Sequence, residues 1–150
     1  MSLRVSVLHG VNLDQLGRRD ATHYGSMTLA ELETQIATFG AEMGIETAFF
    51  QTNHEGHLVE HLHSLRGETD GIIINPGAWT HYAWALHDAL EIAGAPAVEV
   101  HLSDVSNRDA WRQVSVVRDH CIKTVSGHGP DGYQIALEAL RDHLAGPTNS

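Results

Sequence analysis

Residues 4–25 read RVSVLHGVNLDQLGRRDATHYG. The apolar, β-branched start of this stretch, residues 4–8, predicts a buried strand, and a helical pattern begins at Thr28. The connection between them, residues 8–25, is far longer than the about 2–6 residues that usually join a strand to a helix. Loops of this length in compact domains are often functional lids, so this segment is the first place to look for a site.

The connecting segment carries polar groups suited to acid–base chemistry: Asn12, the pair Arg18 and Arg19, and Tyr24. A nearby cation favours the charged form of a phenol and so lowers a pKa that is about 10 when unperturbed. Tyr24 could therefore act as a base. The alternative is that both arginines are solvated and the phenol packs on the surface, and these residues alone slightly favour that alternative.

The composition is that of one globular domain, which we place at residues 1–145, followed by a frayed tail at 146–150. Of the 150 residues, 42% are hydrophobic, and 9 Lys and Arg against 19 Asp and Glu give a net charge of -10. This charge argues against nucleic acid or an anionic membrane as a partner. A single cysteine, Cys121, no signal-peptide pattern and no long apolar run favour a cytoplasmic protein.

Beyond the first loop, short apolar runs alternate with helical patterns. Thr28 and Glu31 have the spacing of a capping box, and Gly44 and Gly67 end two of the helices. Five strands alternating with helices predict a flavodoxin-like α/β fold, a three-layer sandwich around a five-stranded parallel sheet with strand order 2-1-3-4-5. The expected strands are 4–8, 46–51, 71–75, 97–101 and 121–126, and the expected helices are 28–44, about 58–67, 80–92 and 133–144, with a short helix around Trp111.

Polar residues follow three of the predicted strands. Sheets of this class bind ligands beyond the carboxyl ends of their strands, at the switch point between the first and third strands. Because these strand ends are neighbours, the sequence predicts a pocket there. The residues concerned are Asn12, Arg19 and Tyr24 after the first strand, Asn75 and His81 after the third, and Glu99, His101 and Ser103 at the fourth.

Glu99 and His101 lie two residues apart at the end of the fourth strand, so their side chains share a face of the sheet. Glu99 could then orient His101 and stabilise its protonated form, which would make His101 a general acid. A purely structural pair is the alternative. The position at the predicted ligand site favours the acid.

The run from Asn75 to His81 leads from a strand into a helix start. Backbone N–H groups there attract anions, and an amide with an imidazole can hold hydroxyls or a carboxylate, although Asn-Pro-Gly is also an ordinary turn. Ser103 adds a hydroxyl or merely begins a loop. Arg108 and Arg112 could close over an anionic substrate or form surface ion pairs.

Two other patterns carry less weight. Residues 127–132, GHGPDG, match G-x-G-x-x-G, but a dinucleotide fold would need a further strand after the next helix, so we reject NAD binding. His57 and His61 lie four apart in a cluster with His54 and His63, but Glu60 is not where the H-E-x-x-H metal motif requires it. We interpret these histidines as exposed helix residues. The first alternative is incidental metal affinity, and a zinc hydrolase is a more distant one.

Together these residues resemble the type II 3-dehydroquinate dehydratases (type II 3-dehydroquinases) from about Val5 to Leu144. The resemblance implies a flavodoxin-like subunit without cofactor or metal that eliminates water in trans from 3-dehydroquinate, giving 3-dehydroshikimate. The reaction serves the shikimate pathway of aromatic amino acid biosynthesis or quinate breakdown. The family typically forms dodecamers, tetramers of trimers. The motifs, in order, are NLDQLGRRDATHYG, QTNHEG, DGIIINPGAWTH, ALHDAL, VEVHLSDV and GYQIALEAL.

The resemblance also implies roles by position. Tyr24 looks like the base, Arg19 its activator, and Asn12 would help hold a water that stabilises the enolate. His101, paired with Glu99, looks like the acid that protonates the departing hydroxyl. The substrate contacts would be Asn75, His81, Leu102, Ser103 and Arg112, with Arg108 and Asp88 as supporting ion-pair residues and Asp88 reaching a neighbouring subunit's site.

The chain departs from the family's usual residues in the predicted lid. His9-Gly10-Val11-Asn12 stands where Asn-Gly-Pro-Asn is usual, and Asp20-Ala21 replaces Glu-Pro, which removes a proline that would stiffen the lid. No proposed catalytic group is lost. A module that binds a small anion without turnover is the alternative to an enzyme. Further departures are Tyr82, Trp84, His87, Asp104 and Val114.

Overall fold

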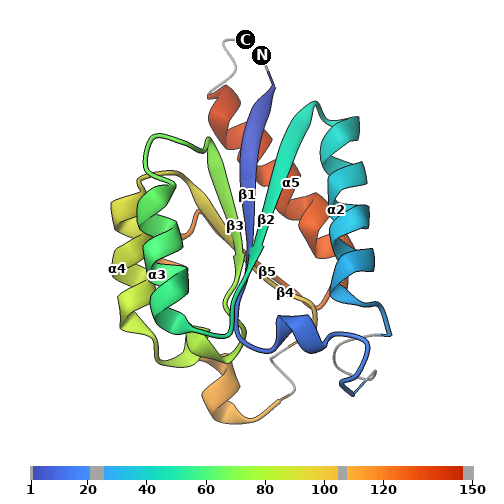
Figure 1. The fold of residues 1–150 in the computed structure, drawn as a ribbon, viewed down its shortest axis with the longest axis vertical. Helices are drawn as coiled ribbons and strands as arrows, with labels where there is room; N and C mark the ends of the chain where they lie inside the picture. Colours follow the sequence, from blue (N-terminus) through green and yellow to red (C-terminus); the bar gives the residue numbers. More distant parts are fainter. Residues whose placement is uncertain (1, 21–25, 105–107, 147–150) are drawn as a thin grey trace.

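The computed structural model describes residues 2–20, 26–104 and 108–146. Its strands form one parallel, 5-stranded sheet in the order β2-β1-β3-β4-β5 (Figure 1). This confirms the predicted α/β class and strand order. The strands are β1 (Leu3–His9), β2 (Ile45–Gln51), β3 (Gly71–Asn75), β4 (Ala97–His101) and β5 (Lys123–Ser126).

Helices cover both faces of the sheet and complete the three layers. α2 (Leu29–Glu42) and α5 (Asp131–Ala145) pack on one face, and α3 (Glu55–Ser64) and α4 (Trp84–Ala93) on the other (Figure 1). The predicted capping box of Thr28 and Glu31 starts α2. Short 3-10 helices occupy the connections: η1 (Leu13–Gln15), η2 (Gly77–His81), η4 (Ala110–Gln113) and η5 (Arg118–His120).

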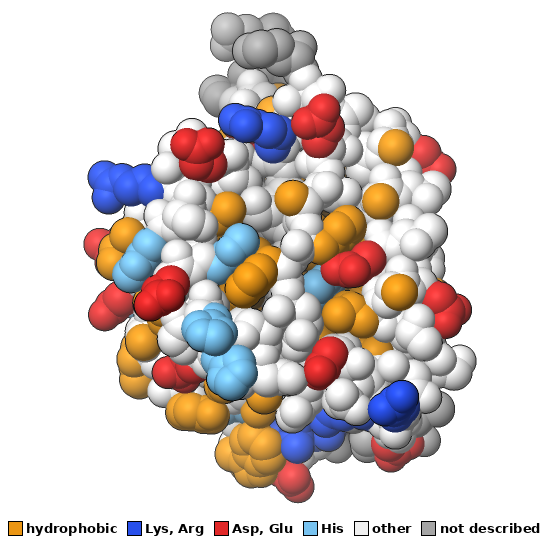
Figure 2. Space-filling model, in the orientation of Figure 1, with side chains coloured by type: hydrophobic (Ala, Val, Ile, Leu, Met, Phe, Trp, Pro, Cys, Tyr) orange, Lys and Arg blue, Asp and Glu red, His pale blue; other side chains and the backbone are white. Residues whose placement is uncertain are grey.

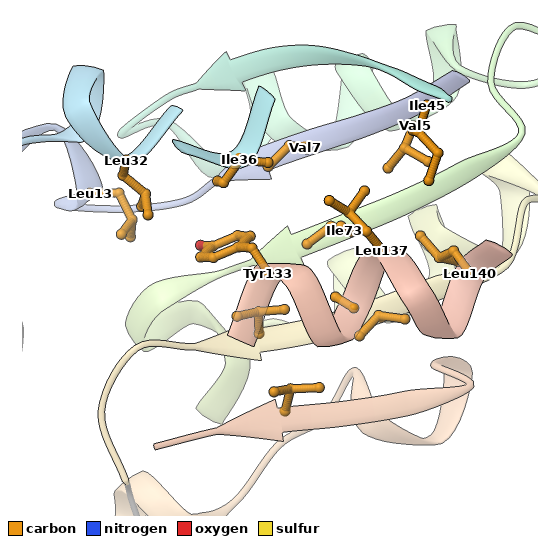
Figure 3. Close-up of a cluster of buried hydrophobic side chains, with 14 of the residues drawn as sticks. Val5, Val7, Leu13, Leu32, Ile36, Ile45, Ile73, Tyr133, Leu137 and Leu140 are labelled. Atoms are coloured by element: carbon orange, nitrogen blue, oxygen red, sulfur yellow. The ribbon is translucent and has the colours of Figure 1, made fainter. Parts of the chain in front are cut away.

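The sheet divides the hydrophobic core into two layers. Val7 and Ile73 face α2 and α5, where Tyr133 also packs (Figure 3). Ile72 and Ile74 face the opposite layer with α3 and α4. β3 is therefore apolar from Gly71 to Ile74 because both of its faces are covered. The two layers hold the carboxyl ends of β1, β3 and β4 in a fixed arrangement.

The helix predicted at 80–92 begins later than expected. Residues 77–81 form η2, and α4 begins only at Trp84. The Thr80 carbonyl accepts a hydrogen bond from the Val116 N–H (2.7 Å), so it is engaged by a distant loop instead of continuing an α-helical ladder.

Other boundaries differ by a few residues: α3 covers Glu55–Ser64 instead of about 58–67. β5 begins at Lys123 instead of 121, and α5 covers Asp131–Ala145 instead of 133–144. Of the tail predicted at 146–150, only Gly146 lies within the described residues. Within that part of the chain, no helix is both long enough and apolar enough to cross a membrane.

The last residue of β1, just before the first loop, is a buried histidine. His9 is 0% exposed, and its Nε2 lies 3.1 Å from Oε2 of Glu33 on α2. Its ring also stacks on Phe49, with the ring centroids 6.1 Å apart. Burial lowers the pKa of His9 from 6.5 to about 4 and raises the pKa of Glu33. His9 is therefore neutral at neutral pH.

The burial of His9 should make the free energy of unfolding fall as the pH drops from 6.5 to about 4. In this window His9 takes up a proton in the unfolded chain but resists it in the folded one, which lowers the free energy of unfolding by about 3 kcal/mol. Glu33, with its raised pKa, acts in the opposite sense because the folded chain binds its proton first.

His9→Asn removes the titrating imidazole and should reduce this fall by about 3 kcal/mol. The measurement is chemical denaturation near neutral pH and between the two pKa values of His9. The exposed His63 provides a matched control, since His63→Asn should leave the fall unchanged. An identical pH dependence in His9→Asn and the parent chain would contradict the expectation.

Candidate active site

The carboxyl ends of β1, β3 and β4 surround a pocket of about 120 Å³. Cavities on the order of 150 Å³ hold a single six-membered ring, so the pocket suits one small molecule. It lies at the switch point where the sequence predicts a site. The lining residues are Val11, Asn12, Leu13, Arg19, Asn75, Gly77, Ala78, His81, His101, Leu102, Ser103, Arg108 and Arg112.

The pocket depends on a close approach between the loops that follow β1 and β3. The Gly10 N–H donates to the Asn75 carbonyl at 2.8 Å, and a Cβ on Gly10 would lie 2.4 Å from the Pro76 carbonyl oxygen. Gly77 has a φ of +63°, and a Cβ there would lie 2.8 Å from the Val11 carbonyl oxygen. Both positions therefore require glycine.

Gly10→Ala should lower the free energy of unfolding by about 1–3 kcal/mol, because two backbone segments must separate to admit the methyl group. The thermal midpoint measures this loss. Gly56→Ala is the matched control, since nothing lies within 4 Å of a Cβ at this position on α3 and alanine favours the helix. Equal thermal midpoints for Gly10→Ala and the parent chain would contradict the close approach.

Two asparagines, Asn12 and Asn75, line the pocket from the joined loops. Asn12 has left-handed backbone angles (φ 69°, ψ 2°), and its N–H donates to Oδ1 of Asn53 at 2.8 Å. Oδ1 of Asn75 accepts from the Gly77 N–H at 3.1 Å. The NH₂ group of Asn75 is then the part that can donate to a ligand oxygen.

Glu99 is fully buried behind His101, with 0% of its surface exposed. Its Oε2 lies 2.6 Å from His101 Nε2 and accepts from Thr80 Oγ1 at 2.5 Å, while its Oε1 accepts from Ser115 Oγ at 2.7 Å. Burial by itself raises the pKa of Glu99, but the hydrogen bonds and the charge of His101 outweigh burial, so the pKa is lowered. Glu99 is therefore an ionised carboxylate at neutral pH.

The ionised Glu99 determines which nitrogen of His101 is available to a ligand. A carboxylate only accepts hydrogen bonds, so Nε2 of His101 carries the proton of their contact. Nδ1 is then the ring nitrogen left for the pocket, which His101 lines. When His101 is protonated, a second proton sits on Nδ1 and the buried carboxylate compensates the charge. This is the arrangement of a general acid.

His81 lines the same pocket as a neutral imidazole. Its Nδ1 lies 2.6 Å from the Val114 carbonyl oxygen, so Nδ1 carries the proton and donates it. Burial lowers the pKa of His81, and the charges of His101 and Arg112 act in the same direction, against the Val114 hydrogen bond. Nε2 of His81 is consequently an acceptor, suited to a ligand hydroxyl.

Cationic side chains gather at this edge of an otherwise acidic chain. Arg19, Arg108 and Arg112 all line the pocket, although the chain has a net charge of -10. Figure 2 shows basic side chains along the lower edge, where the strands end, beside exposed hydrophobic ones. Guanidinium groups bind carboxylates through paired hydrogen bonds, so the pocket suits a small anion that also carries hydroxyls.

Not every predicted site residue lies in the pocket lining. Tyr24 lies outside the described residues. Asp88 lies on α4 with 76% of its side chain exposed, beside His87, and does not line this pocket. Thr80 and Ser115, whose hydroxyls donate to Glu99, were not among the predicted site residues. Thr80 precedes His81 in a singled-out motif, whereas nothing in the sequence shows that Ser115 returns to β4.

The histidine cluster has structural contacts of its own. Histidine side chains gather on the face over α3 (Figure 2), and the rings of His54 and His57 lie 4.8 Å apart at a tilt. His61 stacks on Phe50, with centroids 3.9 Å apart. Over residues 2–20, 26–104 and 108–146, no group of three or more His, Cys, Asp or Glu is placed to hold a metal.

Comparisons with known proteins agree in sequence and in structure. The family model "Dehydroquinase class II" matches residues 3–141. The chain is 46% identical to the 3-dehydroquinate dehydratase of Carboxydothermus hydrogenoformans, over 95% of this chain and 92% of the relative. It is 43% identical to the enzyme of that name from Thermotoga maritima, over 95% and 97%.

A solved structure leads to the same family. The type II dehydroquinase of Propionibacterium acnes superposes with a TM-score of 0.90 at 38% identity, over 95% of this chain and 98% of the other. The pocket described above therefore lies in a fold and a sequence that both match one family along almost the whole chain. The chain belongs to the class II dehydroquinase family.

Proposed function

We propose that the chain is a 3-dehydroquinate dehydratase, which removes water in trans from 3-dehydroquinate and releases 3-dehydroshikimate in the shikimate pathway. The observation that carries this proposal is the Glu99–His101 pair, a buried carboxylate with an imidazole against a pocket lined by arginines. The reaction needs one group that removes a proton beside the ketone and one that protonates the departing hydroxyl.

Substrate binding uses the cations and hydroxyl-binding groups of the pocket. Arg112 holds the carboxylate, and Ser103 and Asn75 donate to oxygens of the ring. The neutral His81 accepts a hydrogen bond from a ring hydroxyl at Nε2. Leu102, which also lines the pocket, contacts the ring.

Proton removal builds negative charge on the carbonyl oxygen, so preorganised donors near that oxygen lower the barrier most. We assign the base to Tyr24 and its activation to Arg19, because a cation near a phenol favours tyrosinate. Asn12 holds a water that stabilises the enolate. The pocket lining by Asn12 and Arg19 supports the last two assignments.

Loss of water completes the reaction. The bond between the ring carbon and the departing hydroxyl breaks, its electrons leave with the oxygen, and the enolate becomes the conjugated enone. His101 gives the proton from Nδ1 to that oxygen, and the Glu99 carboxylate compensates the imidazolium before transfer.

The proposed chemistry uses side chains alone, without cofactor or metal.

The test is an assay with 3-dehydroquinate that follows the ultraviolet absorbance of the conjugated enone in the presence of a chelator. Turnover under these conditions supports the proposal. Calorimetric binding without turnover would overturn it in favour of a small-anion binding module. Turnover that the chelator abolishes would overturn the metal-free mechanism.

The assembly and location belong to the same proposal. We place the enzyme in the cytoplasm as one domain, residues 1–145, in a dodecamer built as a tetramer of trimers. The exposure of Asp88 on α4 supports a role in a neighbouring subunit's site. Light scattering on the purified chain measures the assembly. A monomeric mass with full turnover would contradict both the dodecamer and the role of Asp88 in a neighbouring subunit's site.

A further inference from the structure

Trp111 is a half-exposed aromatic residue next to the pocket, and packing in the hydrophobic core does not account for its position. It lies in η4 with 50% of its surface exposed, and it belongs to neither hydrophobic cluster of the core. A large aromatic side chain that is left half in water contributes little to a core. Its contacts, instead, are with two residues of the pocket.

One of these contacts holds a cation. The guanidinium carbon of Arg112 lies 4.1 Å from the centroid of the Trp111 ring, which is a close cation–π contact. Arginine has many rotamers, and a planar stack restricts the guanidinium to few of them. The indole therefore orients Arg112, which lines the pocket while Trp111 itself does not.

The other contact holds an imidazole. The rings of His81 and Trp111 meet edge to face, with centroids 5.0 Å apart and an interplanar angle of 86°. Aromatic pairs prefer this geometry. Together with the hydrogen bond from His81 Nδ1 to the Val114 carbonyl, it fixes both the tilt and the rotation of the ring. Nε2 is then the nitrogen that His81, as a lining residue, can offer to a ligand.

We propose that Trp111 is a positioning residue that sets the spacing between the Arg112 guanidinium and the His81 imidazole. One indole thus prepares two ligand contacts at once, a cation for a carboxylate and an acceptor for a hydroxyl. A substrate that carries both groups at this spacing binds without paying to order either side chain. The inference rests on the proposed function, because it assigns the carboxylate and a ring hydroxyl of 3-dehydroquinate as the groups that the site recognises.

A series of variants at position 111 separates ring contacts from bulk. Trp111→Leu keeps an apolar side chain but has no π face, and we expect its KM to rise about 5- to 20-fold with kcat within about twofold of the parent, since the lost contacts act on the bound substrate and the transition state alike. Trp111→Phe keeps an aromatic ring for both neighbours and should restore KM to within about threefold of the parent. A KM for Trp111→Leu equal to the parent's, or a loss in kcat alone, would overturn the inference.

Trp84 supplies the matched control. It is 61% exposed and its ring contacts His87, away from the pocket lining. Trp84→Leu should leave KM unchanged. An equal rise in KM for Trp84→Leu would mean that loss of any exposed tryptophan has this effect, which would also overturn the inference.

A crystal structure of Trp111→Leu without ligand tests the same idea independently of turnover. We expect the Arg112 guanidinium to lose its single position and the His81 ring to rotate. Unchanged positions for both would overturn the inference even if the parent enzyme turns over 3-dehydroquinate. Conversely, displaced side chains with no turnover by the parent chain would support the positioning role and reject the proposed function.

Discussion

Replacing His101 with alanine is expected to lower kcat for 3-dehydroquinate by about a hundred- to ten-thousand-fold. The substitution removes the only pocket imidazole that rests on a buried carboxylate among the described residues, and with it the proposed donor of a proton to the departing hydroxyl. KM should rise as well, because His101 also lines the pocket. Steady-state kinetics on the enone absorbance measure both constants.

Two further measurements separate the acid from a general loss of structure. Added imidazole should partly restore kcat in His101→Ala, since a free imidazole can occupy the space of the missing ring and donate the proton. His63→Ala removes an exposed histidine on α3 and should leave kcat unchanged. An unchanged kcat in His101→Ala would mean that another group protonates the leaving hydroxyl.

The sheet was predictable because its pattern reports burial on two faces. Residues 71–74 of β3 are a continuous apolar run, which a strand needs only when helices cover both sides of it. The strand order followed from the class of the fold, because an α/β domain of this size with five strands is typically flavodoxin-like, with the order 2-1-3-4-5. The residues at the carboxyl ends of β1, β3 and β4 were then close to one another by construction.

Other features depend on contacts between segments far apart in the chain. The start of α4 at Trp84 follows from the hydrogen bond between Val116 and the Thr80 carbonyl, and no local pattern encodes that bond. Ser115 reaches Glu99 through the same distant loop. Periodicity gives the type of an element, whereas such tertiary contacts decide where it begins and which polar groups it presents.

The site shows the same division. The positions of Asn75, His81 and His101 were predicted from the ends of the third and fourth strands. All three line one pocket. The residues that support them were not identified from the sequence, because Thr80 and Trp111 act through Glu99, His81 and Arg112 and do not line the pocket themselves. Sequence patterns indicate residues that line a ligand site. The residues that position them are identified only from the three-dimensional structure.

Tyr24→Phe is expected to lower kcat by about a thousand- to ten-thousand-fold while binding of 3-dehydroquinate stays within about threefold of the parent. Phenylalanine keeps the ring and loses only the oxygen that we assign as the base. Calorimetry on the inactive variant measures binding directly, because the substrate is no longer consumed.

Proton exchange in heavy water distinguishes the base from the acid. If Tyr24 removes the proton beside the ketone, Tyr24→Phe should stop both deuterium uptake at that carbon and elimination. His101→Ala should still allow deuterium uptake, because the enolate forms but its hydroxyl leaves slowly. Tyr82→Phe is the matched control, since Tyr82 is 63% exposed and lies outside the pocket lining, and it should keep both activities. Deuterium uptake at the parent rate in Tyr24→Phe would show that the proton is removed without the phenol oxygen. The base would then be another residue.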